Sequence, residues 1–152
     1  MTLQKVNLFS LAHPPHANSL ARSHLLIQGY PTGRKIKGRQ VVDQYSSGQR
    51  YVLITDDDNP YEEVLHIYLL DLELRVVDEI HLSQPFTSGI YQAQHHSGER
   101  LEFRFFNDDT WCLEIRNTPV SKPLNIDHFP ASRPIKLWGQ QYLNLMRTES
   151  VA

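Results

Sequence analysis

The chain has a single cysteine, no long apolar run and no excess of positive charge, and each absence excludes a class of protein. With Cys112 as the only cysteine, an intramolecular disulfide and a cysteine-rich zinc site are both excluded. No apolar run approaches the roughly 18 to 20 residues of a membrane span, and residues 1–12 lack the continuous apolar region of a signal peptide. The chain has a net charge of −2, whereas nucleic-acid-binding proteins usually carry an excess of positive charge. We therefore expect a soluble cytoplasmic protein with no membrane and no nucleic-acid partner.

Catalytic motifs are missing as well. The sequence contains no Gly-rich phosphate loop, no Gly-x-Ser-x-Gly nucleophile elbow and no pair of histidines separated by one residue. It therefore predicts a scaffold more clearly than it predicts a reaction.

The length and composition are those of an ordinary globular domain. The chain has 152 residues, of which 40% are hydrophobic and 21% charged. We expect one β domain over residues 1–152, with a poorly defined N-terminal arm at residues 1–20 and a proline-rich connecting segment at residues 117–134.

The central stretch, residues 40–116, alternates between apolar and polar residues and contains a faint duplication. The sequence Gln-Tyr-Ser-Ser-Gly-Gln-Arg from Gln44 is echoed by Gln-His-His-Ser-Gly-Glu-Arg from Gln94, and an acidic loop follows each copy. Alternation with a period of two predicts strands, and Ser-Gly predicts hairpin turns. We expect an all-β antiparallel meander of about 7 to 9 strands that forms a barrel or a two-layer sandwich. A weak internal duplication would give it two similar sheet units.

The clearest hairpin spans residues 63–71 and 74–82. A turn at Leu72 and Glu73 would place Leu65 opposite Ile80 and His66 opposite Glu79. The face of Leu65 is then the apolar core face, with Asp78 as an exception, and His66 and His81 point away from the core.

A second meander is expected over residues 89–95, 99–106 and 110–116. A consistent register places Tyr91 opposite Phe103 and Glu102 opposite Glu114. Cys112 then lies on the less buried face, opposite Arg104. The face predicted to be buried consists of Tyr91, Ala93, Leu101, Phe103, Phe105, Trp111, Leu113 and Ile115.

The two ends of the chain are harder to interpret. Residues 25–28 favour a strand, and residues 30–33 have the composition of a turn. Four prolines in residues 117–134 predict an irregular segment with a short edge strand at residues 124–126. Residues 135–146 have apolar residues at helical spacing and favour a short C-terminal helix, although residues 142–146 also suit a strand.

The acidic loops are the first candidate site. If the two loops lie at equivalent strand ends, their carboxylates could gather into a site for Ca²⁺ or Mg²⁺, which prefer oxygen ligands on flexible loops. Aspartates are also common turn formers, and the loops lack the EF-hand pattern. The candidate ligands are Asp56, Asp58, Asp108 and Asp109.

Histidines and glutamates offer an acid–base alternative. His66, His95 and His96 could serve a metal-dependent or acid–base enzyme together with the acidic loops. Exposed strand and turn positions are the plainer interpretation for all three. Glu102 and Glu114 would sit at a separation that retaining glycosidases use, but neighbouring arginines favour a surface charge lattice.

One basic cluster is present, consisting of Arg34, Lys35, Lys37 and Arg39. It could contact an acidic partner or a phosphate group. The plainer interpretation is protection of an edge strand from unwanted pairing.

The function that these features favour is a non-enzymatic module that binds a protein partner or a small ligand, with no cofactor. The aromatic residues Phe129, Trp138 and Tyr142 could form the binding surface. The alternatives are the acid–base or metal-dependent enzyme and a structural protein that assembles through an edge strand.

Overall fold

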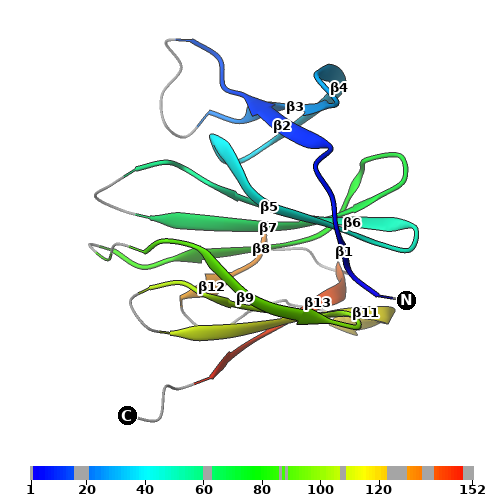
Figure 1. Cartoon of the computed structure of the whole chain (residues 1–152), viewed down its shortest axis with the longest axis vertical. Helices are drawn as coiled ribbons and strands as arrows, with labels where there is room; N and C mark the ends of the chain where they lie inside the picture. The colour runs from blue at the N-terminus through cyan, green and yellow to red at the C-terminus, as the bar shows by residue number, and fades with distance from the viewer. Residues whose placement is uncertain are drawn as a thin grey trace.

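A computed structural model describes residues 2–15, 21–59, 63–85, 87, 89–106, 109–122, 130–134 and 139–148. These residues form thirteen strands in three antiparallel sheets, which confirms the all-β prediction. The described part of the chain contains no helix long and apolar enough to cross a membrane. In Figure 1 the three sheets are stacked, with the largest in the middle.

The middle layer is a six-stranded sheet, which we call the central sheet. Its strand order is β1-β5-β6-β7-β8-β12, and the neighbouring strands are antiparallel. The strands are β1 (Gln4–Lys5), β5 (Gln40–Ser47), β6 (Arg50–Asp56), β7 (Val64–Asp71), β8 (Val76–Ser83) and β12 (Ala131–Ser132).

Two smaller sheets cover its faces (Figure 1). The four-stranded sheet has the order β13-β11-β10-β9, and the three-stranded sheet has the order β2-β3-β4. The strands are β9 (Gln92–Ser97), β10 (Arg100–Arg104), β11 (Thr110–Lys122), β13 (Gly139–Thr148), β2 (Phe9–Ala12), β3 (Ser23–Ile27) and β4 (Tyr30–Ile36).

The larger of two apolar cores lies between the central and four-stranded sheets, which form a sandwich and do not close into a barrel. It confirms both predicted core faces except at three positions: Tyr91 is half-buried, and Ala93 and Val76, the latter on the predicted face of Leu65, are exposed. Its main members are Val52, Ile54, Leu65, Ile67, Leu69, Ile80, Leu82, Leu101, Phe103, Phe105, Trp111, Leu113, Ile115 and Leu143.

The smaller core lies between the central and three-stranded sheets. Phe9, Leu25 and Ile36 come from the three-stranded sheet and pack on Leu53, Tyr68 and Leu70 of the central sheet. The inner strands β6 and β7 are therefore covered on both faces, which is why β7 reads as a nearly continuous apolar run.

A buried carboxylate joins the two sheets of the sandwich. Asp78 on β8 accepts hydrogen bonds from the Tyr142 and Leu143 backbone N–H groups of β13, at 3.0 and 2.9 Å, and pairs with Arg133 at 3.2 Å. The side chains of Asp78 and Arg133 are only 6% and 4% exposed. A charged group on the apolar face is tolerated here because its acceptor oxygens are all used.

A buried amide anchors the three-stranded sheet. The Gln44 side chain on β5 accepts hydrogen bonds from the Leu8 and Phe9 N–H groups, each at 2.8 Å, and donates to the Phe9 carbonyl at 3.1 Å. This contact holds the start of β2 against the central sheet.

The duplicated motif forms the same hairpin in two different sheets. Ser47 pairs with Arg50 in the β5–β6 hairpin, and Ser97 pairs with Arg100 in the β9–β10 hairpin. Each loop has two residues and begins with a glycine at positive φ, +62° at Gly48 and +55° at Gly98. The predicted loops had three residues, 46–48 and 96–98, whereas the observed loops are residues 48–49 and 98–99 and begin two residues later.

Two predictions at the N-terminal end change. Residues 25–27 belong to strand β3, as predicted, but Gln28 does not, and residues 30–33 are not a turn because they begin strand β4. The turn is at Gln28 and Gly29, whose φ values are +49° and +83°.

The predicted register of the β7–β8 hairpin is wrong by two residues. Leu65 pairs with Leu82 instead of Ile80, and His66 pairs with His81 instead of Glu79. The turn is longer than two residues because the Asp71 carboxylate accepts hydrogen bonds from the Glu73 and Arg75 N–H groups, both at 2.9 Å. A shift of two leaves residues 64–69 and 78–83 on their predicted faces. A bulge after Leu69 pairs Leu70 with Val76, so Val76 is exposed and does not join the predicted core face. His66 is buried and not exposed.

The second meander also shifts. Phe103 pairs with Ala93 instead of Tyr91, and Glu102 pairs with Cys112 instead of Glu114. A bulge between Glu102 and Phe103, together with Phe106 at a φ of +62°, accounts for the new registers. The predicted pair of glutamates therefore does not form, and Glu114 is bound to Arg100 at 2.8 Å.

At the C-terminal end, strands replace part of the predicted irregular segment and the predicted helix. Residues 117–122 continue β11, and residues 139–148 form strand β13 in place of the favoured helix. Pairing with β11 outweighs the helical spacing, because β13 completes the sheet over the main core. The predicted edge strand at residues 124–126 lies outside the described residues.

Candidate functional site

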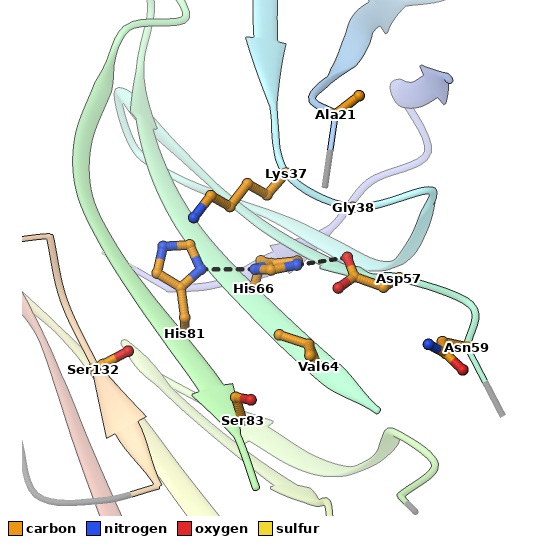
Figure 2. Close-up of a pocket in the computed structure, with 10 residues that line it drawn as sticks. All are labelled: Ala21, Lys37, Gly38, Asp57, Asn59, Val64, His66, His81, Ser83 and Ser132. Carbon is orange, nitrogen blue, oxygen red and sulfur yellow. Dashed lines mark hydrogen bonds and ion pairs between the residues drawn. The ribbon is translucent and has the colours of Figure 1, made fainter. Parts of the chain in front are cut away.

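A pocket of about 560 Å³ opens on the face of the central sheet that the three-stranded sheet covers, next to the smaller core. Figure 2 shows its lining around two histidines, with residues 37 and 38 on one side and β12 on another. Among the described residues the pocket is lined by Ala21, Lys37, Gly38, Asp57, Asn59, Val64, His66, His81, Ser83 and Ser132.

The floor of the pocket is built by strand register. His66 on β7 pairs with His81 on β8, and His81 pairs with Ser132 on β12, so these three side chains form one row across the sheet. Val64 and Ser83 pair in the adjacent row on the same face. The observed register, and not the predicted one, brings the two histidines together.

The two histidines belong to a chain of four titratable groups. His66 Nδ1 lies 2.7 Å from His81 Nδ1, and His66 Nε2 lies 2.8 Å from an oxygen of Asp57. His81 Nε2 lies 2.9 Å from an oxygen of Glu79. The chain thus runs from Asp57 through both rings to Glu79, and it uses all four ring nitrogens.

Burial controls the charge of the inner ring. The His66 side chain is 5% exposed, and this burial lowers its pKa. The hydrogen bond to Asp57 acts in the opposite direction, while the charges of His81 and Lys37 lower the pKa further. His66 therefore favours the neutral form in the folded protein.

Lys37 is held in place through its backbone. Its N–H donates to the Tyr68 hydroxyl oxygen at 2.9 Å, and its carbonyl accepts from the Thr55 hydroxyl at 2.8 Å. Gly38, at a φ of +115°, lies so close to Thr55 that an added Cβ would meet its hydroxyl oxygen at 2.3 Å. A residue without a side chain is therefore needed here to let residues 37–39 pack on β6.

The Lys37 side chain lines the pocket and extends toward the two histidines (Figure 2). Among the described residues no carboxylate lies within ion-pair distance of this ammonium. The hydroxyl groups of Ser83 and Ser132 line the same pocket. These three groups can donate hydrogen bonds to a bound molecule.

The first acidic loop forms the other end of the pocket. Burial raises the pKa of Asp56, and burial together with the charges of Asp56, Asp58 and Asp57 raises the pKa of Glu63. Asp56 is turned inward, where one of its oxygens accepts the Asp58 N–H at 3.1 Å. The carboxylates of this loop repel one another, which contributes to the raised pKa values of Asp56 and Glu63.

The four predicted metal ligands are used differently from one another. Asp56 and Asp58 lie in the first loop, Asp109 pairs with Arg147, and Asp108 lies outside the described residues. The described residues contain no group of three or more carboxylate, histidine or cysteine side chains placed to hold a metal ion.

The predicted basic cluster divides into two parts. Arg34 and Lys35 lie exposed on β4, which is an edge strand of the three-stranded sheet, as the edge-protection interpretation expects. Arg39 donates its backbone N–H to the Asp56 carbonyl at 2.7 Å. Only Lys37 lines the pocket.

The remaining predicted residues lie away from the pocket. Tyr142 is half-buried on β13, with the Arg50 guanidinium 5.3 Å from its ring centre, whereas Phe129 and Trp138 lie outside the described residues. His95 and His96 are exposed on β9. Cys112 is buried, and this burial raises the pKa of its thiol.

Sequence reasoning missed His81, Ser83 and Ser132 as members of one site. The available signal was that His66 and His81 share a face of one hairpin. Ser132 could not be anticipated, because only the pairing of β12 with β8 brings it there.

Compared with known protein families, with curated proteins and with solved structures, the chain gives no match in any of the three. Its function must therefore be inferred from its own geometry.

Proposed function

We propose that the protein binds a small polar ligand in the pocket beside His66 and His81. The observation that carries this proposal is the convergence of an ammonium group, two hydroxyl groups and a histidine pair, of which His66 is buried, on one pocket of about 560 Å³. Ligand sites are typically about 300 to 1,000 Å³ and contain a few well-placed polar groups. We place this activity in the cytoplasm, with which the single free cysteine is compatible.

The histidine chain favours binding over catalysis by an imidazole. A general base must reach the proton that it removes, yet all four ring nitrogens of His66 and His81 are engaged within the chain. The rings therefore shape and polarise the pocket in this state, and the groups free to contact a ligand come from Lys37, Ser83 and Ser132.

A fragment screen by protein-observed NMR tests the proposal. A set of small neutral, cationic and anionic molecules should include some that shift the backbone signals of Val64, His81 and Ser132 together. In Ser83→Phe, which fills the pocket, these shifts should disappear. The matched control is Ser10→Phe on the exposed face of β2, which should keep them. If no molecule of any charge shifts the pocket signals in the folded protein, the proposal is wrong.

An acid–base enzyme is the second candidate, because the Asp57–His66–His81–Glu79 chain could pass a proton between its ends. The two candidates differ in the fate of the ligand. A molecule that binds and is recovered unchanged supports the binding function. A molecule that is converted, with the conversion abolished in His66→Asn, would favour the enzyme.

Assembly through an edge strand remains a prediction. β9 is exposed along its whole length and is an edge strand of the four-stranded sheet, so it offers unpaired backbone groups. A mass by size-exclusion chromatography with light scattering that rises with concentration would support this alternative.

A further inference from the structure

We infer that the ligand carries an oxyanionic group, such as a carboxylate, sulfate or phosphate, which binds beside Lys37, and that its binding is coupled to a proton shared by His66 and His81. This inference rests on the proposed function, because it names the chemistry of the ligand in the same pocket. Two features of the pocket support it: the number of protons that the histidine chain needs for its hydrogen bonds, and the position of the Lys37 ammonium group.

The proton count begins with the three hydrogen bonds of the chain, each of which needs one proton. With both carboxylates ionised, Asp57 and Glu79 only accept, so His66 Nε2 and His81 Nε2 must each carry a hydrogen. The 2.7 Å contact between the two Nδ1 atoms needs a third. Two neutral imidazoles carry only two N–H groups, so the satisfied pair holds one additional proton and a single positive charge.

The location of that proton follows from burial. Because burial lowers the pKa of His66, the neutral ring is His66 and the shared proton lies on the His81 side of the contact. Loss of the proton would leave two nitrogen lone pairs facing each other at 2.7 Å in a partly buried contact, which is unfavourable. The pair is thus a single titrating unit and not two independent histidines.

The charged and titratable groups around the pair come from four elements. Asp57 follows β6, Glu79 lies on β8, and Lys37 lies between β4 and β5. The Tyr68 ring of β7 packs edge-on against His81 with ring centres 5.9 Å apart. Burial keeps the Tyr68 hydroxyl neutral, because it raises the pKa of that group.

Lys37 and the protonated pair repel each other across the pocket. In Figure 2 the Lys37 ammonium lies on the His81 side of His66 and Asp57 on the other side, and the charge of Lys37 acts on His66 to lower its pKa. An oxyanion between them would be attracted to both positive groups, and it could accept hydrogen bonds from Lys37, Ser83 and Ser132. Since such an anion stabilises the protonated pair, lowering the pH through the titration of the pair must tighten anion binding.

Sulfate is a suitable probe because its charge is constant over the pH range used, and dimethyl sulfone is its neutral counterpart of similar shape. We expect sulfate, and not dimethyl sulfone, to shift the NMR signals of His81, Ser83 and Ser132 at constant ionic strength. Lys37→Met should weaken sulfate binding by about tenfold or more, the usual loss for one charge-assisted hydrogen bond. The matched control Lys35→Met, on exposed β4, should change it by less than about twofold.

Imidazole ¹H–¹⁵N NMR tests the proton count without any substitution. At neutral pH the His66–His81 pair should show three nitrogens with attached protons and one without. The pH at which this pattern changes should coincide with the pH at which sulfate affinity changes. In His81→Asn, or in His66→Asn if that variant folds better, sulfate binding should lose this pH dependence.

The outcomes separate the two proposals. If neutral or cationic molecules bind in the pocket and sulfate, acetate and phosphate do not, the oxyanion inference is wrong and the proposed function stands. Equal sulfate affinity of Lys37→Met and the unaltered protein also overturns the inference. If no molecule of any charge binds, the proposed function itself fails. A pair that shows only two attached protons at every pH overturns the coupling.

Discussion

The two faces of the central sheet are put to different uses. Toward the four-stranded sheet, β6, β7 and β8 present an apolar surface that a second sheet covers over its length, and the buried charge of Asp78 is fully paired. Toward the three-stranded sheet, the apolar cover ends at Tyr68 and Leu70, and the next residues on the same face of β7 and β8 are His66 and His81. The first face provides stability, and the second leaves a polar pocket beside a small core.

This contrast shows how one strand can serve both roles. Successive side chains of β7 point to opposite faces. Leu65, Ile67 and Leu69 therefore build the sandwich core. On the other face His66 lines the pocket, and Tyr68 joins the smaller core and accepts the Lys37 N–H. Rigid packing on one face therefore fixes the position of the polar groups on the other.

The largest expected effect is on the sandwich face, from Asp78→Ala. The change leaves Arg133 without its carboxylate and removes the acceptor of two β13 N–H groups, so the free energy of unfolding should fall by about 3 to 5 kcal/mol. Urea denaturation measures it. As a control, Asp71→Ala removes an exposed turn carboxylate and should cost about 1 kcal/mol. Similar losses for both would mean that Asp78 does not join the sheets as described.

An intermediate effect is expected at the edge of the pocket, from Gly38→Ala. The added Cβ would collide with Thr55 at a backbone φ of +115°, and we expect a loss of about 1 to 3 kcal/mol together with weaker ligand binding, because Lys37 would move. Gly29→Ala is the matched control: its φ is +83°, but its Cβ would meet no atom within 4 Å. If both variants lose the same stability, the strain is purely backbone and the contact with Thr55 is unimportant.

The smallest effect is a change in the pH dependence of stability. Because the pKa of His66 is lowered in the folded state, the unfolded chain binds a proton below its ordinary value of about 6.5 while the folded chain does not. The stability that neutral His66 contributes is therefore complete above about pH 6.5 and is lost as the pH falls below it. In His66→Asn, unfolding free energies measured between about pH 6.5 and pH 5.5 should fall less steeply than in the unaltered protein. An equal slope in both would show that His66 is not the group responsible.

Several features of the fold could be read from the sequence because they depend on local patterns. Alternation in residues 63–82 and 99–116 predicted which side chains face the main core, and the repeated Ser-Gly motif predicted two hairpins. Registers were less predictable, since turn length decides them: the Asp71 carboxylate lengthens one turn, and a bulge at Glu102 shifts another. In the first case the error was two residues over most of the hairpin, so those side chains kept their predicted faces, and only the bulge beside Leu70 moved Val76 out of the core face.

The pocket was less predictable than the fold. His66 was a candidate for the enzyme alternative, but an exposed position was favoured because nothing in the sequence of β7 shows that a third sheet covers its second face. Lys37 was one of four basic residues and could not be distinguished from Lys35, which lies on the exposed edge strand.

The sequence by itself determined the all-β class, the hairpin positions and the composition of the main core, because strand periodicity and turn chemistry act over a few residues. The tertiary structure alone decided that residues 139–148 form a strand, that His66 and His81 meet, and that Ser132 and Lys37 join them. These outcomes depend on which distant strands pair and how the sheets stack, and such contacts are set by the free energy of the whole packed chain and not by any local pattern.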